Sequence, residues 1–269
     1  MNHHELEKLL PEIKRIAIEA GRAILEVYGQ DFDVITKDDD SPLTQADLAS
    51  HRVISEALAR LTPDTPQLSE ESADIPFATR SAWSEYWLID PLDGTREFVN
   101  RNGEFTVNIA LIRGHEPIMG VVHVPVTGVT YTGLAGSGAT RSEAGGDPKA
   151  IGVRVPCADP MVVVGSRSHA NPALVQHLDA MGDYELVSMG SSLKFCLVAE
   201  GRADFYPRLG PTSEWDTGAA HAVVLAAGGE IVTLDGEPLS YNRKESYLNP
   251  EFLVIADQSR DWLAPFQGS

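Results

Sequence analysis

The sequence predicts an α/β protein in which layers of helix and sheet alternate in the order α-β-α-β-α. Three observations predict this class: helical apolar periodicity before residue 62, short β-rich runs between residues 86 and 134, and strand-like segments alternating with helical ones after residue 160. The last pattern is typical of βαβ units. We expect helices on an antiparallel sheet in residues 1–157, and helices on a mainly parallel sheet in residues 158–269.

Two amphipathic helices are predicted near the N-terminus. Apolar residues recur at helical spacing from Leu6 to Tyr28, and Gly29 can end that helix. The second helix is predicted to begin at Thr44, because Thr44 and Asp47 have the spacing of a capping box, and to continue to residue 61.

The remaining elements follow from short runs. In the first half, four β-rich runs predict antiparallel strands: YWLI (86–89), FTVNIALI (105–112), IMGVVHV (118–124) and GVTYTGL (128–134). Residues 135–150 are rich in Gly, Ser and charge, which predicts a loop or a hairpin tip. In the second half, five strands are predicted, MVVVG (161–165), ELVSMG (185–190), ADFY (203–206), EIVTL (230–234) and FLVIA (252–256). Helical segments separate the first four of them: 171–182, 191–201 and 216–229.

Acidic residues outnumber basic ones, with 39 Asp and Glu against 21 Lys and Arg, and the net charge is −18. This charge would repel a nucleic-acid backbone, so the sequence argues against a DNA or RNA polymer as a partner. A small phosphorylated substrate stays compatible with it, because salt screens surface fields beyond about 8 Å.

The N-terminus and the cysteines bear on the compartment. MNHHELEKLL lacks the basic and apolar regions of a secretory signal, and no apolar stretch reaches the roughly 18 residues that a membrane span needs. We therefore expect a cytoplasmic protein without a transmembrane segment; peripheral attachment to the membrane, and the choice between monomer and homodimer, stay open. Cys157 and Cys196 are expected to be unreactive buried thiols, and His3 and His4 receive no role.

Asp90 and Asp93 lie in the segment DPLDGT (90–95), directly after an apolar run. Asp, Pro and Gly are turn residues, so for this segment alone a turn and a functional site are equally good interpretations. Glu70, in SEES (69–72), and Asp216, at the start of an apolar helix, are further acids that the local pattern does not need.

A cluster of these four acids would raise their pKa values and oppose folding. Divalent cations would remove that cost, and oxygen ligands suit hard cations, above all Mg²⁺. Pro91 fixes the backbone so that the two flanking acids and the carbonyl of Leu92 can converge. Gly94 allows a ligand to approach the backbone closely.

Asp47, Glu70-Glu71, DPLDGT (90–95) and WDTGAAH (215–221) follow one another as in the inositol monophosphatase superfamily. The chain resembles this family of lithium-sensitive, magnesium-dependent phosphomonoesterases over nearly its whole length, and four dispersed elements are more specific than one motif.

Within that family, three segments most resemble the 3′(2′),5′-bisphosphate nucleotidases: residues 90–112, GSRSH (165–169) and GSSLKF (190–195). This resemblance implies hydrolysis of 3′-phosphoadenosine 5′-phosphate to AMP and phosphate. One departure separates the chain from the inositol monophosphatases. They carry a Glu that holds an inositol hydroxyl at the position of Leu209.

The resemblance also implies the metal ligands, for two or three Mg²⁺ per active site. It assigns Glu70, Asp90 and the Leu92 carbonyl to one ion, and Asp90, Asp93 and Asp216 to a second. Such pairs of ions clamp the attacking and leaving oxygens of an in-line displacement.

Asp47, Thr95 and Glu70 are the implied catalytic residues. Thr95, hydrogen-bonded to Asp47, would orient the attacking water and help to remove its proton. Simpler explanations stay open, because capping accounts for the spacing from Thr44 to Asp47 and turn chemistry accounts for Thr95.

Substrate recognition is expected mainly in the second half. Ser191 and Ser192 lead into a helix whose free N–H groups could hold a phosphate, and Lys194 adds a positive charge nearby. Arg208 is a further candidate for the nucleotide. Ordinary capping by the serines and a surface ion pair of Arg208 are the alternatives.

Residues of the metal site are expected to line the substrate site as well: Leu92, Asp93, Gly94, Thr95 and Asp216. Glu71, Arg167 and His169 are expected beside the site, without a defined role. Two other functions stay open: a phosphatase acting on inositol monophosphate or fructose 1,6-bisphosphate, and a non-catalytic, metal-dependent binding protein.

Overall fold

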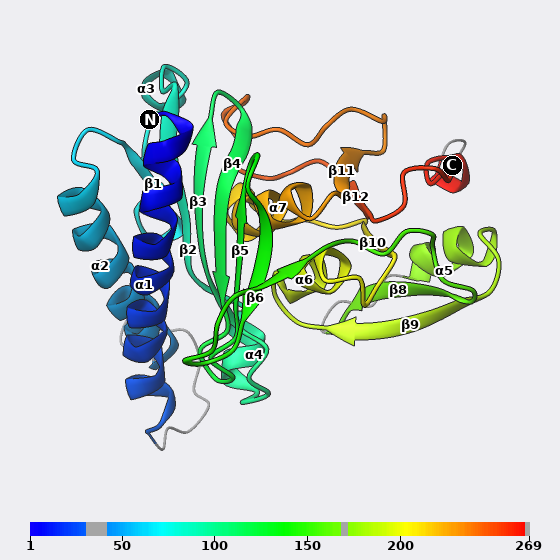
Figure 1. Cartoon of the computed structure of the whole chain (residues 1–269), viewed down its shortest axis with the longest axis horizontal. Helices are drawn as coiled ribbons and strands as arrows, with labels where there is room; N and C mark the ends of the chain where they lie inside the picture. Colours follow the sequence, from blue (N-terminus) through cyan, green and yellow to red (C-terminus); the bar gives the residue numbers. More distant parts are fainter. Residues whose placement is uncertain (31–41, 168–171, 267–269) are drawn as a thin grey trace.

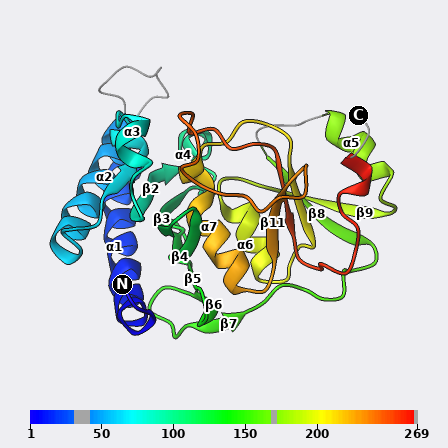
Figure 2. The same ribbon diagram turned by 90° about the horizontal axis from the view of Figure 1, so that it is seen from above.

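The computed structural model describes residues 1–30, 42–167 and 172–266, and its layers follow the predicted order (Figure 1). Helices α1 (His3–Tyr28) and α2 (Pro42–Leu61) cover one face of a seven-stranded sheet. Helices α6 (Leu193–Ala199) and α7 (Glu214–Ala226) lie between this sheet and a five-stranded one. Helix α5 (Pro172–Asp179) and the short η2 (Ala264–Phe266) cover the outer face (Figure 2). The α-β-α-β-α prediction is confirmed.

The two N-terminal helices begin earlier than the sequence predicts. Helix α1 begins at His3, because Asn2 and Glu5 form a capping box in which each side chain accepts the other's main-chain N–H. Helix α2 begins at Pro42, whose missing N–H costs nothing in a first turn. Thr44 therefore lies inside the helix, and the capping box predicted at Thr44 is wrong.

The first sheet has the order β1-β2-β3-β4-β5-β6-β7, and its strands are β1 (Gln67–Ser69), β2 (Glu85–Asp93), β3 (Thr106–Arg113), β4 (Glu116–His123), β5 (Thr130–Leu134), β6 (Gly138–Ser142) and β7 (Lys149–Ile151). Neighbours are antiparallel except β1, which pairs parallel to β2. Where the sequence predicts a loop or a hairpin tip over 135–150, the structure has the antiparallel strands β6 and β7 with a connection between them. Ala139 and Ser142 of β6 are buried against the sheet although the segment is rich in polar residues.

The second sheet has the order β11-β12-β10-β8-β9, with strands β8 (Met161–Ser166), β9 (Tyr184–Met189), β10 (Phe205–Arg208), β11 (Glu230–Thr233) and β12 (Phe252–Ile255). Strands β8, β9 and β10 run parallel, and β12 runs antiparallel to both β10 and β11. Four strands therefore share one direction, and β12 makes the sheet mixed. The predicted boundary near residue 157 lies between the last strand of one sheet and the first strand of the other; the division into two domains stays a prediction.

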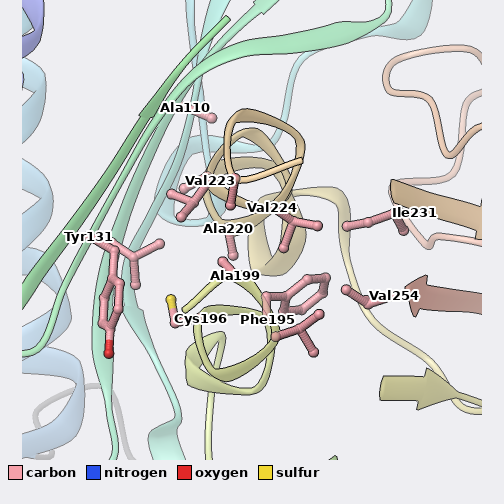
Figure 3. Close-up of a cluster of buried hydrophobic side chains, with 14 of the residues drawn as sticks. Ala110, Tyr131, Phe195, Cys196, Ala199, Ala220, Val223, Val224, Ile231 and Val254 are labelled. Carbon is pink, nitrogen blue, oxygen red and sulfur yellow. The ribbon is translucent and has the colours of Figure 1, made fainter. Parts of the chain in front are cut away.

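Helix α7 packs directly on the backbone of the first sheet. A Cβ added to Gly120 would lie 2.0 Å from the carbonyl oxygen of Ala219, and one added to Gly133 would lie 2.6 Å from that of Ala222. The other side of the helix meets an apolar cluster that includes Phe195 and residues of the second sheet (Figure 3). This packing holds α7 between the two sheets.

The two cysteines differ in how deeply they are buried. Cys196 is buried in that cluster, and burial raises the pKa of its thiol. Cys157 is only half-buried, which corrects the prediction for that residue. Among the described residues, no helix is both long and apolar enough to cross a bilayer.

Candidate active site

A cavity of about 300 Å³ lies where β2, β10 and the first turns of α6 and α7 come together. All five predicted metal ligands line it: Glu70, Asp90, Leu92, Asp93 and Asp216. The other predicted substrate residues line it too: Gly94, Thr95, Ser191, Ser192, Lys194 and Arg208. Asp47, Glu71 and Arg167 do not line it, and His169 is outside the described residues.

Strand β2 does not end before the acids, as the sequence predicts, but continues through them to Asp93. Asp90 pairs with Asn108 and Asp93 with Thr106, so three steps along β2 match two steps along β3. In a regular strand, residues three apart face opposite sides. The extra residue is a bulge, and it allows Asp90 and Asp93 to line the same cavity.

Gly94 then ends the strand with a φ of 96°, and the short helix α4 (Thr95–Val99) follows. This left-handed backbone favours glycine. Thr95 is thereby placed at the cavity wall directly after the acids.

The acids raise one another's pKa. Asp90 is buried, and burial, followed by the charges of Glu70, Asp93, Asp216 and Asp47, raises its pKa well above the ordinary value. Burial and the charge of Asp93 raise the pKa of Asp216 to about 7, against a hydrogen bond from the Ser213 N–H. These shifts show that the acids are within electrostatic reach of one another.

Each aspartate is held through one oxygen. Oδ1 of Asp90 accepts from the Leu92 N–H at 3.0 Å, Oδ2 of Asp93 from the Ser192 N–H at 2.5 Å, and Oδ2 of Asp216 from the Ser213 N–H at 2.9 Å. Within the described ranges, the second oxygen of each takes no hydrogen bond.

The described residues contain no group of three His, Cys, Asp or Glu side chains already close enough to hold an ion. Their chemistry nevertheless fits a hard divalent cation, because the candidate ligands offer oxygen alone, and three carboxylates keep an oxygen that the protein does not use.

Two cationic side chains face the acids. Lys194 is buried, its Nζ donates to the Ser191 carbonyl, and burial lowers its pKa to about 8 against the opposing charge of Asp93. Arg208 donates to the carbonyls of Gly210 at 3.2 Å and Pro211 at 2.7 Å. Both acceptors are main-chain carbonyls of the loop that follows Arg208. These contacts differ from the surface ion pair that the sequence left open as an alternative.

The serines before α6 line the cavity and also have hydrogen-bond partners within the protein. Ser192 donates its main-chain N–H to Asp93 and its hydroxyl to Oδ1 of Asn108 at 2.9 Å. Ser191 has a φ of 46°, and its side chain accepts from the Leu193 N–H at 3.4 Å. Helix α6 has only seven residues. The N–H of Ser192, predicted to hold a phosphate, therefore already has an acceptor within the protein.

Three further residues named in the sequence analysis lie around the cavity or in the second sheet. Asp47 is buried on α2, and its charge reaches Asp90. Its predicted hydrogen bond to Thr95 stays a prediction. Arg167 makes two hydrogen bonds of 2.8 Å to Glu104, and Leu209 packs with apolar residues of the second sheet.

Sequence reasoning missed Thr106 and Asn108, which contact Asp93 from β3. A signal was present, because they are polar residues two positions apart within the apolar run FTVNIALI. Such spacing places both on one face of a strand.

The chain is similar to known proteins over most of its length. The sequence profile described as the inositol monophosphatase family matches residues 5–262. The 3′(2′),5′-bisphosphate nucleotidase CysQ of Escherichia coli (strain K12) is 51% identical over 249 residues, which cover 91% of this chain and 99% of that protein. CysQ of Haemophilus influenzae is 37% identical and covers 97% of both chains.

Two solved structures share the fold. The crystal structure of CysQ from Bacteroides thetaiotaomicron has a TM-score of 0.79 and 42% identity, covering 91% of this chain and 95% of its own. An inositol monophosphatase from Anabaena has a TM-score of 0.78 and 26% identity, covering 97% and 96%. Enzymes of the family are metal-dependent. The chain therefore belongs to the inositol monophosphatase family.

Proposed function

We propose that the protein is a 3′(2′),5′-bisphosphate nucleotidase that removes the 3′-phosphate of 3′-phosphoadenosine 5′-phosphate and releases AMP and phosphate. The observation that carries the chemistry is that Glu70, Asp90, Asp93 and Asp216, distant in sequence, line one cavity. The choice of substrate is supported by the 51% identity to a nucleotidase over 99% of its length.

Magnesium is the cation that these residues would hold. Glu70, Asp90 and the Leu92 carbonyl would bind one ion, and Asp90, Asp93 and Asp216 a second. When bound, such ions lower the pKa of a water and neutralise charge on the leaving oxygen. With their charges compensated, the carboxylates no longer oppose folding.

The other side chains act on substrate and water. Thr95, at the cavity wall, would orient the attacking water, and Asp47 would assist through Thr95. Lys194 and Arg208 place positive charge at the wall of this acidic cavity, where it could bind the phosphates of a bisphosphate. The side chain of Leu209, packed among apolar side chains, carries no oxygen that could accept from an inositol hydroxyl, unlike the Glu of the inositol monophosphatases.

Phosphate release from three substrates tests this function: 3′-phosphoadenosine 5′-phosphate, inositol 1-phosphate and fructose 1,6-bisphosphate, each with Mg²⁺. We expect the nucleotide to have the highest kcat/KM, and Li⁺ to inhibit its hydrolysis. Faster hydrolysis of either sugar phosphate would overturn the substrate assignment. Turnover of none of the three would overturn the enzymatic function itself.

A further inference from the structure

Four polar residues form one buried cluster beside the cavity, and we name Asp93, Thr106, Asn108 and Ser192 the Ser192 network. Oδ2 of Asp93 accepts from the Ser192 N–H at 2.5 Å, from Nδ2 of Asn108 at 3.3 Å and from the hydroxyl of Thr106 at 3.4 Å. Thr106, Asn108 and Ser192 are almost fully buried. Burial strengthens such contacts, because water does not compete for the donors.

The hydrogen bonds of this network are mutually consistent. The Ser192 hydroxyl donates to Oδ1 of Asn108, so the amide Nδ2 of Asn108 is turned toward the Asp93 carboxylate. The hydroxyls of Thr106 and Ser192 are 2.9 Å apart, and because the Ser192 hydrogen goes to Asn108, the single Thr106 hydrogen is divided between this contact and the longer one to Asp93. If the Asn108 amide were flipped, its Oδ1 would face Oδ2 of Asp93 with no hydrogen between them. The network therefore selects one orientation of the amide.

The Ser192 N–H and the Asn108 amide both donate to Oδ2 of Asp93, and the Thr106 hydroxyl lies 3.4 Å from the same oxygen. Rotation of the carboxylate would break these bonds together, so Oδ1 is held apart from the network, in a side chain that lines the cavity. Oδ1 is the oxygen that a cation would use.

The network also connects strand β3 of the first sheet with the turn that precedes α6. Thr106 and Asn108 lie on the face of β3 whose further residues, Ala110 and Ile112, pack in the same apolar cluster as α7. Ser192 comes from the turn before α6. The position of Asp93 therefore depends on how that turn docks on β3.

The turn before α6 is itself held firmly. The Gly190 N–H donates to Glu104 at 2.8 Å, and a Cβ on Gly190 would lie 2.5 Å from Cγ of Glu97. Ser191 keeps a left-handed φ of 46°, a conformation that non-glycine residues hold only where surrounding contacts impose it.

We infer that Thr106, Asn108 and Ser192 are positioning residues, which fix Asp93 with one oxygen presented to a divalent cation and make metal affinity depend on the docking of the 190–192 turn. The inference rests on the proposed function, since it takes Asp93 as a metal ligand. Loss of such outer partners typically weakens metal binding by about 10- to 100-fold.

Binding of Mn²⁺ to the full chain, without substrate and followed through the electron paramagnetic resonance signal of the free ion, tests the inference. We expect Asn108→Ala to weaken binding at least about tenfold, and Thr106→Val and Ser192→Ala to weaken it in the same direction. Thr106→Ser keeps the hydroxyl and should bind like the native protein.

The matched control is Thr132→Val. Thr132 is also a buried threonine of the same sheet, and its hydroxyl contacts only that of Thr140 among the described residues, at 2.8 Å. A merely structural role would lower the melting temperature of the Thr106 and Thr132 valine variants alike and leave the Mn²⁺ affinity of both unchanged.

The outcomes separate the two claims. Native affinity in Asn108→Ala, Thr106→Val and Ser192→Ala would overturn the inference and leave the proposed function standing. Tight Mn²⁺ binding by the native protein, weakened in these variants but without phosphatase activity, would support the inference and overturn the function. Absence of Mn²⁺ binding by the native protein would overturn both.

Discussion

Arg80 and Asn242 are joined by two buried hydrogen bonds: Nη1 of Arg80 donates to Oδ1 of Asn242 at 2.5 Å, and Nδ2 of Asn242 donates to the Arg80 carbonyl at 2.7 Å. The Asn242 N–H donates in turn to both carboxylate oxygens of Glu214, at 2.9 and 3.0 Å. Glu214 is the first residue of α7. A side chain of the short helix α3 (Phe77–Arg80) therefore anchors the helix start that carries Asp216.

Replacement of this arginine should destabilise the fold strongly. Arg80→Met leaves the Asn242 side chain and the carbonyls of Lys244 and Glu245 without their donor, so we expect the free energy of unfolding to fall by about 3 kcal/mol. Arg80→Lys should not restore it, because an ammonium lacks the fork of donors. Urea unfolding measures both, with exposed Arg60→Met as the control. A loss in Arg80→Met no larger than in the control would contradict this account.

The close packing of α7 on the first sheet leads to a second prediction. Gly120→Ala would place a Cβ 2.0 Å from the Ala219 carbonyl, and we expect a loss of at least about 1–3 kcal/mol in the free energy of unfolding. In Gly146→Ala the nearest atom is 3.6 Å away, and stability should change by less than about 0.5 kcal/mol. Equal stability of the two variants in chemical denaturation would disprove the close contact.

The buried His221 predicts that the folded protein becomes less stable in acid. His221 is buried with its Nδ1 2.9 Å from the Tyr241 hydroxyl, and burial lowers its pKa to about 3. The folded chain keeps it neutral, whereas the unfolded chain takes up a proton below its ordinary pKa of about 6.5. Its contribution to stability is therefore complete above pH 6.5 and declines as the pH falls toward 3.

His221→Gln isolates that contribution. The slope of unfolding free energy against pH, measured between pH 4.5 and 6, should change by the equivalent of about one proton relative to the native protein. Exposed His4→Gln is the control for the loss of a surface histidine. An unaltered slope in His221→Gln would show that His221 does not titrate as the structure predicts.

Lys194 makes a prediction for substrate binding. Burial lowers its pKa to about 8, so in the free protein it is charged below that pH and loses its charge above it. The KM for 3′-phosphoadenosine 5′-phosphate should rise as the pH increases from 8 to 9.5. Lys194→Arg stays charged and should remove that rise, while Lys194→Gln should raise KM below pH 8 and match the native protein at pH 9.5. A KM profile that Lys194→Arg leaves unchanged would assign the effect to another group.

The sequence predicted most of the elements, because apolar periodicity reports directly on which faces are buried. It failed where a contact made later in the chain decides the local structure. Strand β6 has a polar composition, and its burial comes from distant partners: it pairs with β5, Ala139 packs in the large apolar cluster, and Ser142 accepts a hydrogen bond from Lys14 of α1. The β2 bulge likewise depends on register against β3, which no local pattern in DPLDGT contains.

The acids of the candidate site could be predicted because carboxylates on apolar elements are conspicuous. The partners that orient them were missed: Thr106 and Asn108 stand out as polar residues in an apolar run, but nothing local links them to Asp93 or Ser192. Ser192 was expected at a substrate phosphate, and its distant partner Asn108 gave no sign of pairing with it. Only the folded arrangement shows that both act on Asp93.

The most direct test of the central claim, that the gathered acids hold a catalytic cation, is phosphate release from 3′-phosphoadenosine 5′-phosphate as a function of Mg²⁺ concentration. Asp90→Asn keeps the shape of the side chain and removes the charge on which the other acids act; exposed Asp147→Asn is the matched control. We predict that activity requires Mg²⁺, that Asp147→Asn behaves like the native protein, and that Asp90→Asn loses at least about a hundredfold in kcat/KM, close to 3 kcal/mol of transition-state stabilisation. Native activity in Asp90→Asn, or full activity after chelation of divalent ions, would contradict the claim.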